Sequence, residues 1–231
     1  MSPGFPLMTT EPEPVPRIDW ATPSIVLTLL FLLLLTALHV VKSDLDPSWH
    51  FISEYEIGRF GWMMQAAFLA LAGANLAIMA AVRPAVRGIV GWIGLALFLV
   101  GTLGTVLAGL YVSDSITTAP EMASPSGRMH NLGGSLGLAG ILGTWIVSAT
   151  LLRAESWRPA RRGVAVATAI VTLGFLVAFV SIATLAARCG GAFGPDVPVG
   201  WPNRIGILSG CAWLLIVAGE ARRLARPSSI G

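Results

Sequence analysis

Six apolar runs, each long enough to cross a lipid bilayer, constrain the fold of this chain more than any other feature of its sequence. An α-helix rises about 1.5 Å per residue, so roughly 20 apolar residues cross the ~30 Å hydrocarbon core of a membrane. Charged residues make up only 12% of the 231 residues, against roughly 25% in soluble domains. The sequence therefore predicts an all-α integral membrane bundle of six transmembrane helices, at residues 24–41, 61–82, 88–112, 131–152, 163–187 and 203–219.

The apolar runs leave no room for a separate soluble domain. The longest connections, 42–60 and 113–130, are each shorter than twenty residues. The first run lacks the basic start and the small-residue cleavage motif of a secretory signal, so we expect it to be retained as a helix. We divide the chain into a mobile, Pro-rich segment at 1–23, a six-helix transmembrane domain at 24–222 and a short basic tail at 223–231.

The distribution of arginine predicts the orientation of the chain in the membrane. Arginines gather at 83–87, at 153–162 and in the C-terminal tail, whereas most acidic residues lie in 42–60, 113–130 and 188–202. Short loops rich in Lys and Arg stay in the cytoplasm. We therefore expect both termini to be cytoplasmic and the chain to be a multi-pass protein of the plasma membrane. The formal net charge of +3 follows from arginines that flank apolar helices, so we expect no nucleic-acid partner.

Polar chemistry gathers on the side opposite the arginine-rich loops. The stretch PSWHFISEYEIGRFGW, which begins at residue 47, places a histidine, two glutamates and a tyrosine between two apolar runs. All three histidines of the chain, His39, His50 and His130, fall on this side. Tyr111 and Asp114 end the third predicted helix at the same level. These groups indicate either a solvated loop or one wall of a site.

The motifs around these residues resemble a known family. The histidine at the end of the first run, ISEYE before the second, YVSD at the end of the third and GRMHN at the start of the fourth are similar to the domain of unknown function family 998. This is a group of polytopic membrane proteins of bacteria and archaea. The resemblance extends from about Leu38 to Gly219. It implies a six-helix integral membrane fold and no particular activity, so no residue role is carried over from it.

The residues themselves favour an outward-facing polar pocket that binds or converts a lipid-like molecule, with a polyprenyl or acyl chain. A carboxylic acid that is partly desolvated at the membrane border stays protonated more readily and can act as a general acid. Glu54 and Asp114 are the candidate catalytic carboxylates. The candidate substrate-binding residues are His39, His50, Tyr55, Tyr111, Arg128 and His130.

Three other functions remain open at this point. The polar residues can simply cap the bundle of a structural or partner-binding membrane subunit. Histidine and carboxylate donors are also ligands that Zn²⁺ takes, so a metal-dependent membrane hydrolase is an alternative, and His39 with His130 can in principle hold a haem. The sequence contains no HExxH or HxxxH spacing. We therefore assign no metal ligand and expect no cofactor.

Glycine and alanine recur in the third and fourth predicted helices. Small residues spaced by four, such as Gly104 with Ala108 and Gly133 with Gly137, let helix backbones approach closely in lipid. We predict that both helices pack tightly against a neighbour near their outer halves. The same glycine-rich surfaces can also form an oligomer.

Overall fold

The computed structural model describes residues 18–226, and all of its long elements in that range are α-helices. They are α1 (Ala21–Val41), α2 (Gly61–Val82), α3 (Gly88–Leu110), α4 (Pro125–Arg153), α5 (Arg161–Arg188) and α6 (Gly200–Ala225). Each of the six is long and apolar enough to cross a membrane. The prediction of an all-α protein with six membrane-spanning helices is therefore confirmed. Residues 1–17 and 227–231, which fall in the predicted mobile segment and tail, lie outside the described residues.

Short 3-10 helices lie in the connections between the long helices. They are η1 (Ile52–Glu56), η2 (Arg83–Ala85), η3 (Pro120–Met122) and η4 (Glu155–Ala160). The most buried of them is η1, which belongs to the polar stretch that follows α1.

Capping residues set the helix ends, and they extend several helices beyond the predicted apolar runs. α4 begins at Pro125 rather than at 131, because the Ser124 hydroxyl accepts the N–H of Gly127 at 2.9 Å. α1 begins at Ala21 rather than at 24, after the Asp19 carboxylate accepts the N–H of Ala21 at 3.0 Å. A side-chain oxygen that satisfies a free N–H in the first turn stabilises the start of a helix. Residues 21–23 and 223–225 therefore belong to helices.

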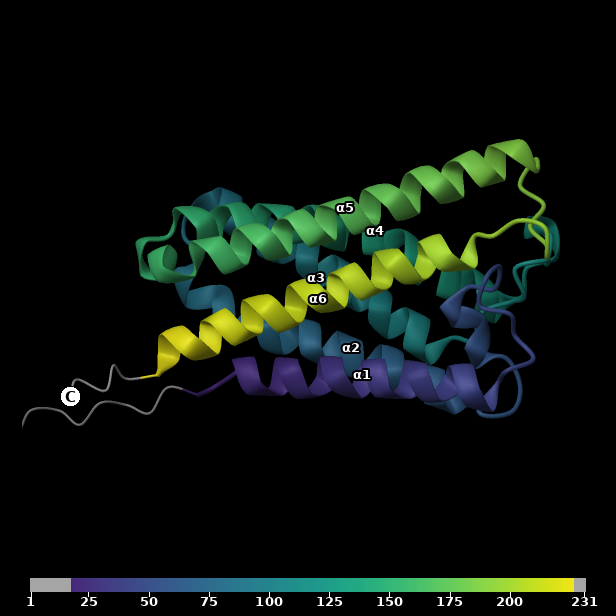
Figure 1. Ribbon diagram of the computed structural model, residues 1–231, viewed down its shortest axis with the longest axis horizontal. Helices are drawn as coiled ribbons and strands as arrows, with labels where there is room; N and C mark the ends of the chain where they lie inside the picture. Colours follow the sequence, from purple (N-terminus) through teal and green to yellow (C-terminus); the bar gives the residue numbers. More distant parts are fainter. Residues whose placement is uncertain (1–17, 227–231) are drawn as a thin grey trace, which may run out of the picture.

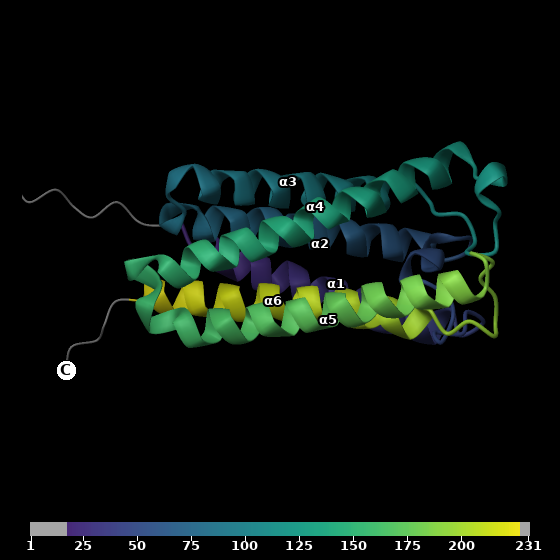
Figure 2. The ribbon, with the colours of Figure 1, turned by 90° about the horizontal axis from the view of Figure 1, so that it is seen from above.

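The six helices form a ring in which five of the six neighbouring pairs make more contacts than the sixth pair, α4 and α5. The most extensive contacts are between α3 and α4, α5 and α6, and α1 and α2, and these three hairpins are joined by contacts of α2 with α3 and α1 with α6. α4 and α5 make far fewer contacts. Figure 2 shows α4 crossing the bundle obliquely, so that it lies beside α3 at one end and nearer α5 at the other.

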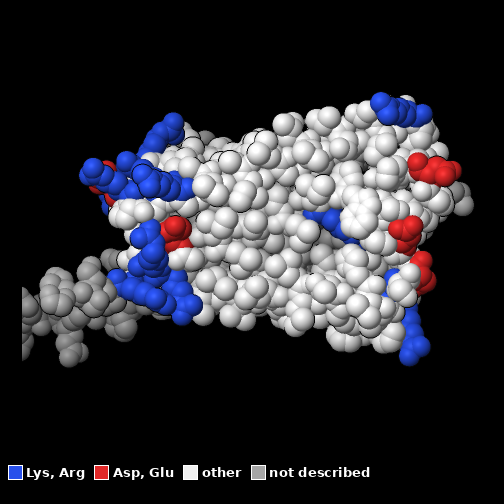
Figure 3. Space-filling view, viewed as in Figure 1, with Lys and Arg blue, Asp and Glu red and all other residues white. Residues whose placement is uncertain are grey.

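The two ends of the bundle differ in charge. The described ends of the chain lie together at one end, where Asp19 Oδ2 and Arg222 Nε are 3.9 Å apart (Figure 1); we call this the terminal end. The opposite end, here the loop end, carries the connections 42–60, 111–124 and 189–199. Figure 3 shows basic side chains gathered at the terminal end, acidic ones mainly at the loop end and an almost uncharged band between them. Which end faces the cytoplasm stays a prediction from the arginine distribution.

Glycines of α3 and α4 face each other in the most extensive helix contact among the described residues. Gly101 packs against the backbone of Gly140, and Gly104 packs against the backbone of Gly133. Small residues at such a crossing let two backbones approach until van der Waals contact replaces side-chain packing. The prediction that each of these two helices packs tightly against a neighbour is confirmed, and each is the partner of the other. The assignment of their outer halves stays a prediction, because it depends on the orientation in the membrane.

α5 leaves the bundle toward the loop end. Its buried residues are Val164, Ala167, Val171, Gly174 and Ala178, and none follows Ala178 in the remaining ten residues of the helix. Gly174 packs against Ser209 of α6. Toward the loop end, α4 lies beside α3 and away from α5 (Figure 2). The seam between α4 and α5 is therefore widest at the loop end.

Two adjacent glycines of α4 provide a test of the helix crossing. A Cβ added at Gly133 would lie 2.5 Å from the carbonyl oxygen of Gly104, whereas one added at Gly134 meets nothing within 4 Å. We expect Gly133→Ala to destabilise the protein by about 1–3 kcal/mol, the usual cost of overpacking. The matched variant Gly134→Ala should be neutral or slightly stabilising, because alanine favours a helix over glycine. Thermal unfolding in detergent measures both, and equal midpoints would contradict the tight α3–α4 contact.

Candidate functional site

The polar stretch after α1 is folded into the loop end of the bundle rather than exposed as a loop. Within η1, the side chains of Ile52, Glu54, Tyr55 and Glu56 are at most 2% exposed. A buried turn with two carboxylates requires a partner for each polar group, because an unpaired buried group costs about 1–3 kcal/mol. We call residues 42–60 the inserted segment.

Side chains of Lys42, of α6 and of the α3–α4 connection bind backbone groups of the inserted segment. Lys42, directly after α1, donates its ammonium group to the carbonyl oxygens of Tyr55, at 3.0 Å, and of Ile57. Burial lowers the pKa of Lys42 below its usual value. Asn203 of α6 accepts the N–H of Ile52 at 3.1 Å, and the Ser113 hydroxyl donates to the carbonyl of Ser53 at 3.0 Å. These contacts fix the segment against α1, α6 and the α3–α4 connection.

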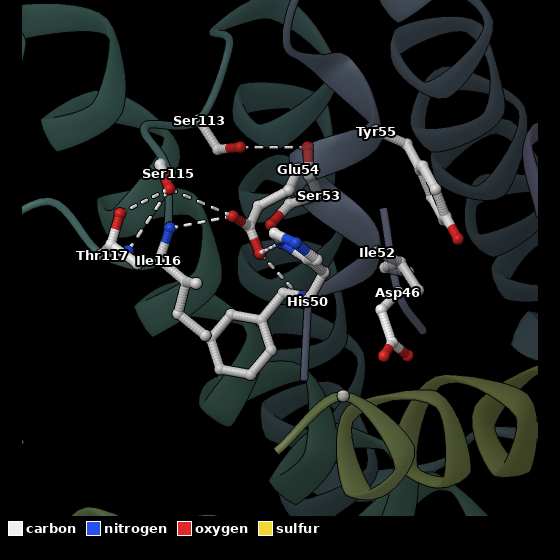
Figure 4. Close-up of polar contacts among 12 residues, drawn as sticks. Asp46, His50, Ile52, Ser53, Glu54, Tyr55, Ser113, Ser115, Ile116 and Thr117 are labelled. Atoms are coloured by element: carbon white, nitrogen blue, oxygen red, sulfur yellow. Dashed lines mark hydrogen bonds and ion pairs between the residues drawn. The ribbon is translucent and has the colours of Figure 1, made fainter. Parts of the chain in front are cut away.

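Glu54, the first predicted catalytic residue, ties the inserted segment to the α3–α4 connection (Figure 4). Its Oε2 accepts the N–H of Phe51 at 2.9 Å, and its Oε1 accepts the N–H of Ile116 at 2.9 Å and the Ser115 hydroxyl at 3.4 Å. His50 Nδ1 lies 3.0 Å from Oε2, but off the line that a hydrogen bond requires. Both oxygens therefore act as acceptors in a structural cross-link.

Asp114, the second predicted catalytic residue, positions the start of α4. Its Oδ2 accepts the N–H of Ser124 at 2.7 Å, and Ser124 in turn caps α4. The carboxylate lies so close to Gly127 that a side chain there would collide with it. Arg128 donates to the carbonyl of Ala123 at 2.6 Å and forms no ion pair with the described residues.

A second buried histidine–carboxylate pair lies deeper in the bundle. His130 Nδ1 of α4 is 3.2 Å from Glu56 Oε2 and 2.9 Å from the carbonyl oxygen of Tyr111. Both neighbours are acceptors, so Nδ1 carries the hydrogen. Glu56 Oε2 also accepts the N–H of Ser113 at 2.9 Å, whereas Glu56 Oε1 is buried without a partner among the described residues.

Arg204 of α6 is a central residue of the loop end that the sequence analysis did not single out. Its guanidinium is buried, with 5% of the residue exposed. Nε donates to His39 Nε2 at 3.0 Å, Nη1 donates to the carbonyls of His50 at 2.7 Å and Gly200 at 3.1 Å, and Nη2 donates to the Tyr55 hydroxyl at 3.2 Å. One side chain thereby connects α1, the inserted segment and α6.

The contacts of Arg204 fix the chemical state of two predicted substrate-binding residues. His39 Nδ1 lies 2.7 Å from the carbonyl oxygen of Leu35, so it donates there and leaves Nε2 to accept from Arg204. His39 is therefore the neutral Nδ1–H tautomer. Burial raises the pKa of the Tyr55 phenol above its usual value, so this hydroxyl stays protonated in the network.

A cavity of about 690 Å³ lies inside the helix ring, beneath the inserted segment. Its walls come from α2, α3, α4, α5 and α6, with Ile52 and Ser53 of the inserted segment at the loop end. Toward the terminal end it is closed by the apolar core around Trp213, whose Nε1 donates to the Ser148 hydroxyl at 3.0 Å. The cavity is therefore located at the depth of the membrane.

The α4 wall of the cavity is open to the side. Asn131, Gly134, Ser135 and Leu138 all line the cavity and are all exposed. This is the seam where α4 and α5 separate. The opening of the cavity faces the lipid rather than a water-filled pocket between the loops.

Most of the predicted site residues are grouped at the loop end, but only one lines the cavity. His130 does so. Glu54, His50 and Tyr55 are buried in the contacts of the inserted segment, and Asp114 holds the start of α4. His39 lines a separate groove on the outside of the bundle. The cavity thus differs from the expected outward-facing pocket, because the inserted segment occupies the loop end, where that pocket was expected.

The metal and haem alternatives gain no support from this arrangement. Within residues 18–226, no group of three or more His, Cys, Asp or Glu side chains is placed to hold a metal ion. The two histidines considered for haem are engaged elsewhere: His39 with Arg204, and His130 with Glu56.

Arg204 and Glu56 were missed for different reasons. Arg204 stands inside the predicted span 203–219, and an ionisable residue within an apolar span is a marker of a functional or structural site. Arg204 could therefore have been singled out from the sequence. Glu56 and Glu54 stand two positions apart in the same motif, and nothing in the sequence says which carboxylate pairs with the cavity-lining His130 and which cross-links the loops.

The hydrogen bonds of Glu54 generate a stability prediction. In Glu54→Gln, an amide N–H₂ replaces one acceptor oxygen and faces a backbone N–H, so one buried donor loses its partner. We expect a loss of about 1–3 kcal/mol in the free energy of unfolding, measured by thermal or denaturant unfolding in detergent. Glu121→Gln, at an exposed residue of η3, is the matched control and should leave stability unchanged. If both variants unfold like the wild type, the cross-linking role of Glu54 is wrong.

Comparison with known proteins agrees with the fold and gives no activity. No curated protein and no solved structure matches the chain. A family model described as protein of unknown function (DUF998) matches residues 25–220, which covers all six helices except the first residues of α1 and the last residues of α6. The chain is thus a multi-pass membrane protein that belongs to the DUF998 family.

Proposed function

We propose that this protein binds an amphiphilic, lipid-like molecule with an acyl or polyprenyl chain in the cavity between α4 and α5. The observation that carries the proposal is the cavity itself, which has mostly apolar walls and a side opening at membrane depth. Its volume of about 690 Å³ falls within the roughly 300–1,000 Å³ of small-molecule sites. A molecule that enters from the bilayer does not have to cross water.

The polar groups of the cavity suit a molecule with one polar end. His130, Asn131 and Asn203 gather near the loop end, together with Ser53. The hydroxyls of Thr102, Thr105 and Thr144 instead donate to carbonyls of their own helices. The deeper walls therefore behave as apolar surface, with the Asn75 carboxamide as the exception. A polar headgroup near His130 and a chain along α4 and α5 match this distribution.

The orientation of the site follows from the arginine distribution. On the positive-inside rule, the loop end faces away from the cytoplasm. We infer that the protein resides in the plasma membrane and that the headgroup end of the cavity lies in the outer half of the bilayer.

Filling the cavity tests the proposal without disturbing the helix packing. Gly137 lines the cavity, and a Cβ added there meets nothing within 4 Å. We expect Gly137→Leu to fold normally and to retain roughly tenfold less co-purified lipid-like molecule, because about 1.4 kcal/mol of steric cost changes affinity tenfold. The measurement is mass spectrometry of molecules extracted from protein purified in mild detergent.

Gly219→Leu is the matched control, since Gly219 is an exposed glycine of α6 with open space around it and does not line the cavity. This variant should retain the molecule as the wild type does. A wild-type protein that carries no specific amphiphile above the level of bulk lipid would refute the proposal. So would equal retention by both leucine variants, and a non-catalytic structural or partner-binding role would then take its place.

A second candidate function is conversion of the bound molecule by acid–base chemistry. The observation that favours it is the His130–Glu56 pair, because His130 lines the cavity and Glu56 is buried behind it. A histidine oriented by a carboxylate is the usual general acid or base. Conversion by Glu54 and Asp114, the carboxylates chosen from the sequence, requires the inserted segment and the α3–α4 connection to move, since both carboxylates are held in loop contacts.

This second candidate predicts a change in the identity of the bound molecule. His130→Gln should leave the substrate unconverted, so the molecule that co-purifies should differ in mass from that of the wild type. His50→Gln changes a histidine at the same end that does not line the cavity, and it should carry the wild-type molecule. An identical mass in all three proteins argues against conversion at His130. A mass change in Asp114→Asn alone would restore the carboxylate assignment.

A further inference from the structure

A second hollow lies on the outside of the bundle, between α1 and α6 near the loop end. It is a groove of about 500 Å³. Its walls are the side chains of Leu32, Leu35, Ile205 and Leu208, and its polar members are Thr36, His39 and Arg204. Figure 3 shows basic atoms within the otherwise uncharged band of this face. The cavity described above lies inside the ring and is not lined by α1, so the two hollows are separate.

The guanidinium at this groove has no counter-ion among the described residues. Its four hydrogen bonds go to a neutral imidazole, two carbonyl oxygens and a phenol. They leave one N–H of the guanidinium without a partner. The nearby Asp46 forms no ion pair with Arg204. Hydrogen bonds from Ser48 lower the pKa of Asp46, and the charge of Arg204 adds only a weaker effect in the same direction. A buried cation without an anion is costly.

The depth of the groove matches the headgroup region of a bilayer. Arg204 lies in the second turn of α6 and His39 in the last turn of α1. Trp201, which also lines the groove, is 52% exposed, and exposed tryptophans are enriched where hydrocarbon meets water. An anion at Arg204 is thus level with lipid phosphates, and the leucine walls continue toward the membrane centre.

We propose that this groove binds one anionic glycerophospholipid of the adjacent leaflet, with its phosphate at Arg204 and an acyl chain between α1 and α6. The lipid supplies the negative charge that the protein lacks at this point. It also covers the apolar walls, and it seals the side of the loop end where Arg204 joins the inserted segment to α1 and α6. This site is independent of the cavity and of the function proposed for it.

Native mass spectrometry with two lipids of identical acyl chains tests the proposal. Purified protein in detergent is titrated with phosphatidylglycerol or with zwitterionic phosphatidylcholine. We expect one phosphatidylglycerol to be retained about tenfold better, because charge-assisted hydrogen bonds are strong in a desolvated site. Thr36→Trp should remove this preference, since Thr36 is exposed, lines the groove and donates its hydroxyl to the carbonyl of Leu32 rather than taking part in the hydrogen bonds of Arg204. Leu33→Trp, at an exposed position of the same helix outside the groove, should keep it.

Four results would overturn the proposal. The first is equal retention of the two lipids, and the second is unchanged retention by Thr36→Trp. The third is displacement of phosphatidylglycerol by inorganic phosphate at equal concentration. The fourth is loss of the lipid in Gly137→Leu rather than in Thr36→Trp. The third places free phosphate rather than lipid at Arg204, and the fourth places the lipid in the inner cavity. Arg204→Gln should also abolish the preference; if that variant does not fold, Thr36→Trp still decides.

Discussion

The guanidinium of Arg204 is the interaction on which the loop end of this protein depends. A turn that carries two buried glutamates costs less free energy in a membrane bundle when most of its polar groups find partners. Arg204 supplies hydrogen bonds to α1, to the inserted segment and to the start of α6 at once. Lys42 and Asn203 extend the same network to the backbone of η1 and its neighbours. Because Arg204 and Asn203 of α6 and Lys42 after α1 all bind the backbone of the inserted segment, the segment is held in one place, and its position defines the loop-end limit of the cavity.

The cavity arises from unequal helix contacts. Facing glycines bring α3 and α4 to backbone contact, and α5 packs tightly on α6 only as far as Ala178. The two hairpins are therefore each compact, and the space between them at the loop end is not filled by side chains. In a membrane such a seam faces hydrocarbon rather than water, so its apolar walls stay out of contact with solvent.

The two hollows divide the polar groups of the loop end between them. His130, backed by Glu56, faces the inner cavity, whereas His39, fixed as a neutral acceptor by Arg204, faces the outer groove. The third histidine, His50, lies beside Glu54 within the inserted segment. The three histidines that the sequence grouped on one side thus belong to three environments. Their common level in the membrane was predictable, but the direction of each ring was not.

The six helices, their approximate positions and the gathering of polar chemistry at one end were predictable from the sequence, because apolar run length and loop composition respond directly to the thickness and the polarity of a bilayer. Tight packing of α3 and of α4 was also predictable, since glycine spacing reports how closely two backbones approach, but their pairing with each other was not. The roles of the carboxylates, as cross-links or as the partner of a cavity-lining histidine, depend on the folded arrangement. Glu54 and Glu56 differ in role because the 3-10 turn points one toward the α3–α4 connection and the other toward α4. That direction is set by partners more than fifty residues away in the chain, which no local pattern can encode.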